Sequence, residues 1–216
     1  MIHYSSAEDR LNSWSHAAGI LLALVVGGAF LIWCVRRADS WATVGVALYL
    51  LGMLASYVTS TLYHGLPQHS RARQVLRRWD HAAIYWHIAG SYSPVTLVAL
   101  RQAGLWGWGL FSFVWLAAIV GSVISFRGLR EHSHLETVCF VIMGLSVLVA
   151  FKPLMDCLEP AAIHWLIAEG VFYVTGAAVY ALSPGRPFAH SLFHFFVLAG
   201  SVCHLFCVWH LLLQYL

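Results

Sequence analysis

Charged residues are scarce in this chain. Lys, Arg, Asp and Glu make up 10% of its 216 residues, whereas 60% of the residues are hydrophobic. Soluble domains contain about 25% charged and about 45–50% apolar residues. So few charges could not cover the surface of a water-soluble domain, but a surface that faces lipid tails needs no such cover. The composition therefore excludes an ordinary soluble domain and predicts an all-α membrane protein.

The sequence also lacks a disulfide pattern, a signal peptide and a strong net charge. Four of the five cysteines lie in apolar runs and only Cys157 lies in an expected loop, which is typical of packing residues. Residues 1–13 are polar and lack the basic and then apolar order of a cleaved signal, so the first apolar run is expected to be a retained span. The net charge of +3 gives no indication of a nucleic acid partner.

Apolar runs of about 20 residues, the length that crosses a bilayer, divide the chain into seven expected spans. Charged residues, Pro or Gly bound the runs, and tryptophans recur near their ends, as interfacial anchors do. We therefore expect residues 1–216 to form a single seven-transmembrane helix bundle, with residues 1–13 as a short cytoplasmic segment. The fifth run is short and is expected to extend back through Leu135. The spans are Trp14–Val35, Trp41–Tyr63, His81–Leu100, Leu105–Phe126, Thr137–Phe151, Ala161–Leu182 and Ser191–Leu213.

The basic residues predict the orientation, because they gather on the cytoplasmic side of membrane proteins. With the N-terminus inside, eight of them lie inside and four outside, so we expect the C-terminus to be outside. The basic stretch Ser70–Arg78 fits this topology signal, and contact with anionic lipid is an alternative. The inner residues are Arg10, Arg71, Arg73, Arg77, Arg78, Arg127, Arg130 and Arg186, and the outer ones are Arg36, Arg37, Arg101 and Lys152.

Ionisable residues inside spans are costly and usually mark a site. Four span ends that are far apart in the sequence place such groups at one membrane depth, at the predicted inner face. His16 opens the first span, His64 ends the second, Asp80 opens the third, and His190 and His194 open the seventh.

His190 and His194 are four residues apart, which puts both imidazoles on one helical face. His64 supplies a third imidazole, and Ser60 shares its face. Three imidazoles with an open position for water form the ligand set of a catalytic zinc. Asp80 is then placed to hydrogen-bond the bound water or a ligand. Interhelical hydrogen bonding is the alternative explanation of such a histidine pair.

Three further polar residues lie deeper in the predicted spans. His204 is ten residues beyond His194, roughly 15 Å along a helix, so it cannot reach the same ion and is expected to belong to the packing or to a water network. His87 follows Asp80 on the same face and is expected to line a polar cavity. Glu169 is either neutral, paired with a polar neighbour, or part of a water-filled path.

Several segments together resemble the haemolysin III family, the bacterial branch of the progestin and adiponectin receptor family. They cover residues 9–204, which is nearly the whole chain, and their combination is specific although each is weak alone. Asn12 and His16 belong to the first segment. The segments are Asp9-Arg-Leu-Asn-Ser-Trp-Ser-His16, Ser60-Thr-Leu-Tyr-His64, Asp80-His-Ala-Ala-Ile-Tyr85 with Ile88-Ala-Gly-Ser-Tyr-Ser-Pro94, and His190-Ser-Leu-Phe-His194 with Val197-Leu-Ala-Gly-Ser-Val-Cys-His204.

The resemblance implies a zinc ion near the inner leaflet of a bacterial plasma membrane. In the family a Ser-x-x-x-His histidine and the two histidines of His-x-x-x-His hold the zinc, which here are His64, His190 and His194. The family's aspartate that meets zinc through water matches Asp80, and its serine matches Ser60. Asp9 in place of the usual Glu, together with His87 and Glu169, departs from the family pattern.

Two functions remain open from the sequence. The first is a zinc-dependent hydrolase of a lipid amide or ester, because the family belongs to a wider group with alkaline ceramidases. The second is a non-enzymatic membrane protein that senses or adjusts the lipid state around a structural zinc. Ion conduction through Glu169, His87 and His204, or haemolysin-like permeabilisation, is a weaker third possibility. In every case the expected partners are membrane lipids.

Overall fold

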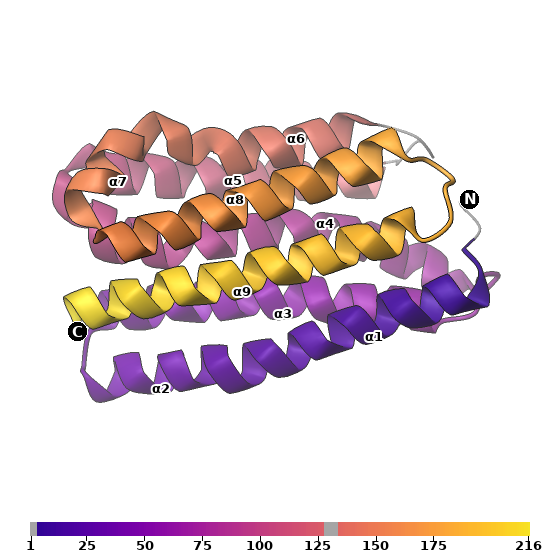
Figure 1. Ribbon diagram of the computed structural model, residues 1–216, viewed down its shortest axis with the longest axis horizontal. Helices are drawn as coiled ribbons and strands as arrows, with labels where there is room; N and C mark the ends of the chain where they lie inside the picture. The colour runs from indigo at the N-terminus through magenta and orange to yellow at the C-terminus, as the bar shows by residue number, and fades with distance from the viewer. Residues whose placement is uncertain (1–3, 128–133) are drawn as a thin grey trace.

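The computed structural model describes residues 4–127 and 134–216, and in these residues every regular element is helical (Figure 1). The elements are α1 (Ser6–Leu22), η1 (Ala23–Gly27), α2 (Gly28–Arg36), α3 (Ser40–Gly65), α4 (Arg71–Pro94), η2 (Val95–Ala99), η3 (Leu100–Ala103), α5 (Leu105–Arg127), α6 (His134–Leu145), η4 (Ser146–Ala150), α7 (Phe151–Cys157), α8 (Pro160–Leu182) and α9 (Ala189–Tyr215). Short π or 3₁₀ turns join some of the α-helices into longer rods, so α1, η1 and α2 form one helix.

Six helical segments in the described part of the chain are long and apolar enough to cross a membrane. Together they make the chain a multi-pass membrane protein, as the composition predicts. The segments are Ser6–Arg36, Ser40–Gly65, Leu105–Arg127, Leu135–Cys157, Pro160–Leu182 and Ala189–Tyr215.

The remaining long helix, α4, contains the expected span His81–Leu100 up to Pro94, and η2 and η3 contain the rest. It does not meet that criterion of length and hydropathy. Its later residues are buried almost without exception, between α3 and α5. A helix surrounded by protein needs no lipid-facing apolar surface, and it can carry polar residues if these are satisfied. Ser91, Ser93 and Thr96 donate to carbonyl groups of their own helix. The number of spans and the orientation in the membrane stay predictions.

Two of the expected spans are longer in the structure than predicted. The first helix begins at Ser6 rather than Trp14, because Ser5 caps it in a capping box with Glu8. The polar residues of the expected cytoplasmic segment therefore form the first turns of α1. The fifth segment runs from Leu135 to Cys157, so Cys157 ends a helix and does not lie in a loop.

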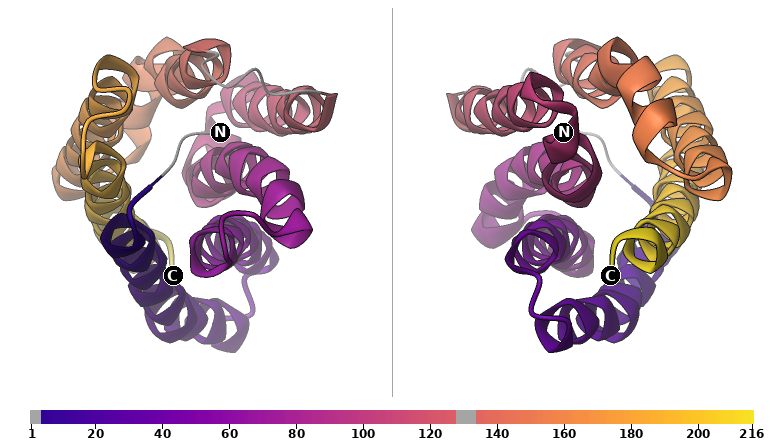
Figure 2. Two further views of the ribbon diagram at one scale, coloured as in Figure 1. Left: turned by 90° about the vertical axis from the view of Figure 1, so that its right-hand side faces the viewer. Right: turned by 90° about the vertical axis from the view of Figure 1, so that its left-hand side faces the viewer.

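Viewed along their axes, the helices stand in a ring (Figure 2). Around the ring α1 packs against α3, α3 against α4, α4 against α5, α5 against α6, α6 against α8, α8 against α9, and α9 against α1. The α3–α4 pair approaches closely at Gly52 and Gly90, where a Cβ atom would overlap the Trp86 carbonyl and the Leu48 carbonyl, respectively.

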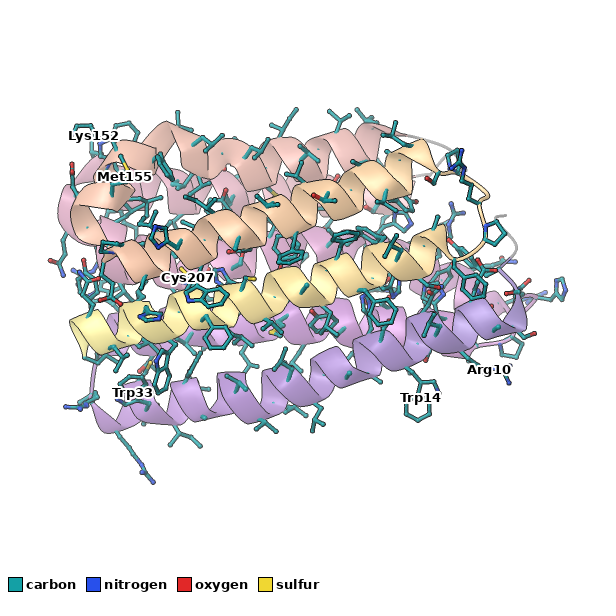
Figure 3. All side chains as sticks on the ribbon, viewed as in Figure 1. Arg10, Trp14, Trp33, Lys152, Met155 and Cys207 are labelled. Atoms are coloured by element: carbon teal, nitrogen blue, oxygen red, sulfur yellow. The ribbon has the colours of Figure 1, made fainter. Side chains whose placement is uncertain are left out.

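Polar and charged side chains mark the two ends of the bundle. Arg10 projects from the end where the chain begins, Lys152 lies at the opposite end with the C-terminus, and Trp14 points away from the bundle (Figure 3). The N-terminal end also receives the last turn of α3 and the first turn of α9 (Figure 1). The five cysteines are unpaired, and Cys34, Cys203 and Cys207 are buried, which agrees with the packing role predicted for them.

Candidate metal centre

Three imidazoles converge at the N-terminal end of the bundle. His64 comes from the last turn of α3, and His190 and His194 come from the first two turns of α9. The Nε2 atom of His190 lies 3.2 Å from that of His64 and 3.0 Å from that of His194. Three nitrogen ligands of one tetrahedral ion, each about 2.0–2.1 Å from it, lie about 3.3 Å apart. The three-histidine group is thus spaced to hold a metal ion.

The opposite nitrogens of two of these rings are fixed by the first helix. The Nδ1 atom of His64 lies 3.1 Å from Asp9 Oδ1, and the Nδ1 atom of His194 lies 3.2 Å from the Asn12 carbonyl oxygen. Both acceptors require a proton on Nδ1, which leaves the Nε2 lone pair free to point at a common centre. The early start of α1 is what brings Asp9 and Asn12 here.

Asp9 is itself held in place by Arg73 of α4, whose guanidinium nitrogens lie 2.7 and 3.0 Å from the two carboxylate oxygens. Burial alone would lower the pKa of Arg73, but the Asp9 carboxylate outweighs burial and raises it, so the guanidinium stays charged. Such a bidentate pair is geometrically strict. The sequence pattern does not mark Arg73 as a site residue, because topology already explains its position in a basic stretch.

Further side chains of the N-terminal segment enclose the three histidines. The Tyr4 ring stacks on His190, with 4.9 Å between centroids, and His16 stacks on His194 at 3.8 Å. Burial and the neighbouring Tyr63 raise the pKa of the Tyr4 phenol, which therefore stays neutral. Asn12 accepts a hydrogen bond of 2.6 Å from Ser191. The predicted residues Asn12 and His16 thus lie at the site, as neighbours of the ligands.

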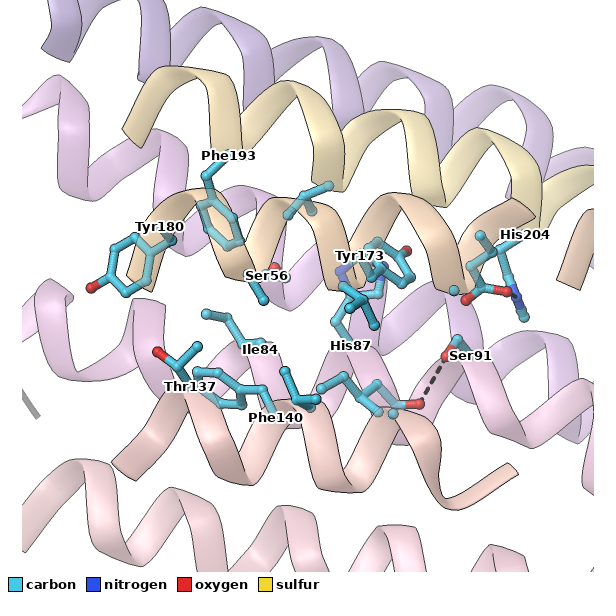
Figure 4. A pocket seen from close by; sticks show the side chains of 18 of the residues that line it. Ser56, Ile84, His87, Ser91, Thr137, Phe140, Tyr173, Tyr180, Phe193 and His204 are labelled. Carbon is cyan, nitrogen blue, oxygen red and sulfur yellow. Dashed lines mark hydrogen bonds and ion pairs between the residues drawn. The ribbon is translucent and has the colours of Figure 1, made fainter. Parts of the chain in front are cut away.

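A cavity of about 200 Å³ lies between the helices (Figure 4) and reaches this centre at His190 and His194. His190 and His194 form part of its wall, together with the predicted site residues Asp80, Ser60 and His87. Ser60 of α3 approaches the Asp80 carboxylate of α4. The structure therefore places a carboxylate and a hydroxyl on the same cavity as the candidate ligands.

Glu136 of α6 is a buried carboxylate that also lines the cavity, and it is absent from the residues predicted for the site. It accepts hydrogen bonds from Ser125 at 2.5 Å and from His81 at 2.9 Å, so it joins α4, α5 and α6. Glu136 lies at the start of the expected fifth span, between Leu135 and Thr137, where an acidic residue is readily taken for the polar end of a helix. The one feature of the sequence that could have pointed to Glu136 is its partner His81, which directly follows Asp80.

The deeper polar residues form a separate group. Glu169 of α8 lies 2.6 Å from Nδ1 of His204 of α9, so it has the polar partner that was one of the three possibilities for this residue. Ser201 receives a hydrogen bond of 2.7 Å from Tyr57 and lies 3.4 Å from Nε2 of His87. His87, Glu169 and His204 therefore line the cavity without reaching the three-histidine group.

Comparisons with known proteins agree over nearly the whole chain. A family model described as haemolysin-III related matches residues 4–205. Hemolysin-3 of Bacillus cereus is 34% identical, over 93% of this chain and 90% of its own. The Hemolysin-3 homolog of Bacillus subtilis is 32% identical, over 95% and 94%. The monocyte to macrophage differentiation factor of Homo sapiens is 26% identical, over 94% and 83%.

Proposed function

The chain belongs to the haemolysin-III related family, and on that basis we propose that it is a zinc-dependent hydrolase of a lipid amide or ester. The observation that carries the proposal is the shared cavity: His190, His194, Asp80 and Ser60 all line it. A metal centre that only supports the fold needs no such cavity, since structural sites are closed by four protein ligands.

The proposed ligands are His64, His190 and His194. Zinc suits three neutral imidazoles, and zinc enzymes often use three protein ligands and leave a further position open. When bound, zinc supplies Lewis acidity that polarises a carbonyl group and lowers the pKa of water from about 15.7 towards about 7.

The residues of this chain then have separate roles. Asp80 orients the attacking water and accepts its proton as the new carbon–oxygen bond forms, and it returns a proton to the leaving amine or alcohol. Ser60 donates a hydrogen bond to the oxygen on which negative charge develops. The apolar wall of the cavity, which includes Ile88, Leu166 and Val197, accommodates the acyl chain and excludes water.

The proposed setting is the plasma membrane of a bacterium, with seven spans, the N-terminus inside and the metal centre near the inner leaflet. In this arrangement α4 is the third span along the chain and raises the number from six to seven. A lipid then reaches the cavity from the bilayer, which is why membrane lipids are the proposed substrates and partners. The whole chain, residues 1–216, acts as one domain.

The decisive experiment compares Asp80→Ala with a matched loss of a carboxylate, Asp156→Ala. Asp156 is exposed and pairs with Lys152 at the opposite end of the bundle. We expect purified wild-type protein and Asp156→Ala to release fatty acid from a lipid amide or ester, and Asp80→Ala to lose this activity while it retains zinc. Full activity of Asp80→Ala with zinc bound would refute the role of Asp80. A zinc-loaded wild type that releases no fatty acid from lipid amides or esters would refute the hydrolase and leave the metal in a structural role.

A further inference from the structure

The pair of Glu169 and His204 lines the deep end of the cavity, away from the three-histidine group. Glu169 is 6% exposed and His204 1%, their side chains are 2.6 Å apart, and both line the cavity (Figure 4). An ionisable pair deep in a membrane helix bundle is costly and is seldom present without a use. The mechanism proposed above gives it none, because His204 is too far along α9 to reach the metal centre.

The pair retains an unused hydrogen-bonding atom. The proton on Nδ1 of His204 is donated to Glu169, so Nε2 of the same ring is an acceptor. That Nε2 atom is buried and has no hydrogen-bond partner among the residues that the structure describes. The described lining of the cavity contains neither Lys nor Arg. The deep end of the cavity can therefore accept a hydrogen bond, and it offers no Lys or Arg side chain to an anionic group.

Large apolar side chains are buried beyond this pair, and the next polar pair along α9, His210 with Glu159, is partly exposed. Leu100, Leu154, Leu211 and Leu212 are fully buried towards the C-terminal end. These side chains offer no polar route onward from Glu169 towards that end. The pair is thus better suited to recognise a group that enters along the cavity than to pass ions through the membrane.

The distance between this pair and the metal centre follows from α9, which carries both His204 and His194. His194 and His204 are ten residues apart on α9, which corresponds to roughly 15 Å. Between them the wall is mainly apolar, with Ile88, Val174 and Val197 among its members. A ligand that reaches from one end to the other needs an apolar chain with a hydrogen-bond donor at about this distance from its carbonyl group.

We propose that Glu169 and His204 form a recognition site for a hydroxyl group on the acyl chain of the lipid substrate, roughly 15 Å from the carbonyl that is hydrolysed. This inference rests on the proposed function. A hydroxyl is favoured over an ammonium group, because an ammonium group would have to leave water for the interior of the bundle at a much higher desolvation cost.

The test measures binding of two fatty acids, which are products of the proposed reaction, to the full-length protein in detergent with zinc. The probes are 12-hydroxyoctadecanoic acid and octadecanoic acid, which differ only in the hydroxyl group. We expect the wild type to bind the hydroxylated acid about tenfold more tightly, as one additional buried hydrogen bond allows.

The variant Glu169→Leu/His204→Leu removes both partners, so that neither is left buried and unpaired. We expect it to bind the two acids equally, with the affinity for octadecanoic acid close to that of the wild type. The matched control is Thr137→Val, which removes a polar group from another part of the cavity wall and should leave the preference intact. Equal binding of both acids by the wild type, or a preference that persists in the double variant, would overturn the inference.

A third variant separates this inference from the proposed function. In His190→Ala/His194→Ala the carboxylate loses its metal anchor, so both acids should bind more weakly by the same factor. Unchanged binding by this variant would contradict the proposed metal-anchored substrate, whatever the hydroxyl preference. A wild type that binds neither acid would overturn both proposals.

Discussion

The Nδ1 atom of His64 lies 3.1 Å from Oδ1 of Asp9, and this contact joins the end of α3 to the first turn of α1. A ring nitrogen held in this way fixes the orientation of the whole imidazole, and the opposite nitrogen then faces His190. The three-histidine group therefore depends on residues that do not themselves approach the metal position.

Replacement of Asp9 tests this dependence. We expect Asp9→Ala to weaken zinc binding by about 10- to 100-fold, because loss of an outer hydrogen-bond partner has effects of this size. Affinity is measured by competition with a chromophoric chelator. Asp9→Asn keeps an acceptor for the His64 ring and should recover part of the loss. Unchanged affinity in Asp9→Ala, with a normal thermal midpoint, would contradict the positioning role.

Metal removal should destabilise the folded protein through the same three ligands. A ligand present at about 100 times its dissociation constant stabilises the state that binds it by about 2.7 kcal/mol. We therefore expect a chelator to lower the thermal midpoint of the wild type in detergent. The variant His190→Ala/His194→Ala should melt at the same temperature with or without chelator. An equal chelator effect on both proteins would place the metal elsewhere.

The close approach of α3 and α4 predicts that replacing a glycine by alanine lowers the unfolding free energy at the contact but not at an open position. Gly52→Ala would force a Cβ atom into the Trp86 carbonyl, and we expect a loss of about 1–3 kcal/mol. At Gly109 of α5 the added methyl group would enter open space, so Gly109→Ala should be neutral or stabilise the helix by up to about 1 kcal/mol. Both are measured by thermal or denaturant unfolding, and equal effects would contradict the described helix contact.

The pairing of Glu169 with His204 predicts strong non-additivity. Each single replacement, Glu169→Leu or His204→Leu, leaves one buried polar group without its partner and should cost about 3 kcal/mol. The double variant removes both groups and should be close to the wild type in unfolding free energy. A double-mutant cycle measures this coupling, and additive losses would show that the two side chains do not interact.

Much of the candidate site is readable from the sequence. The spacing of His190 and His194 predicts that both side chains lie on one face of a helix. The span boundaries predict that they lie at the same membrane depth as His64 and Asp80. These inferences need only helix periodicity and span boundaries. The structure brings the three imidazoles together as expected, and it places Asp80 on the cavity beside them.

What the sequence does not reveal depends on contacts between distant segments. The pairing of Glu169 with His204 depends on how α8 is rotated against α9. The pairing of Asp9 with Arg73 requires the first turn of α1 to approach the first turn of α4. A search for apolar runs also misses helical turns that are polar. The capping box of Ser5 and Glu8 extends α1 into residues expected to precede it, and the burial of α4 lets that helix be more polar than a lipid-facing span.

The metal content of the purified protein decides whether His64, His190 and His194 hold one zinc ion. Wild type and His190→Ala/His194→Ala are purified in detergent without added metal and analysed by mass spectrometry of the elements. We expect about one zinc per chain in the wild type and almost none in the variant. A well-folded wild type without zinc, or a variant that retains it, would show that the three-histidine group is not the metal site.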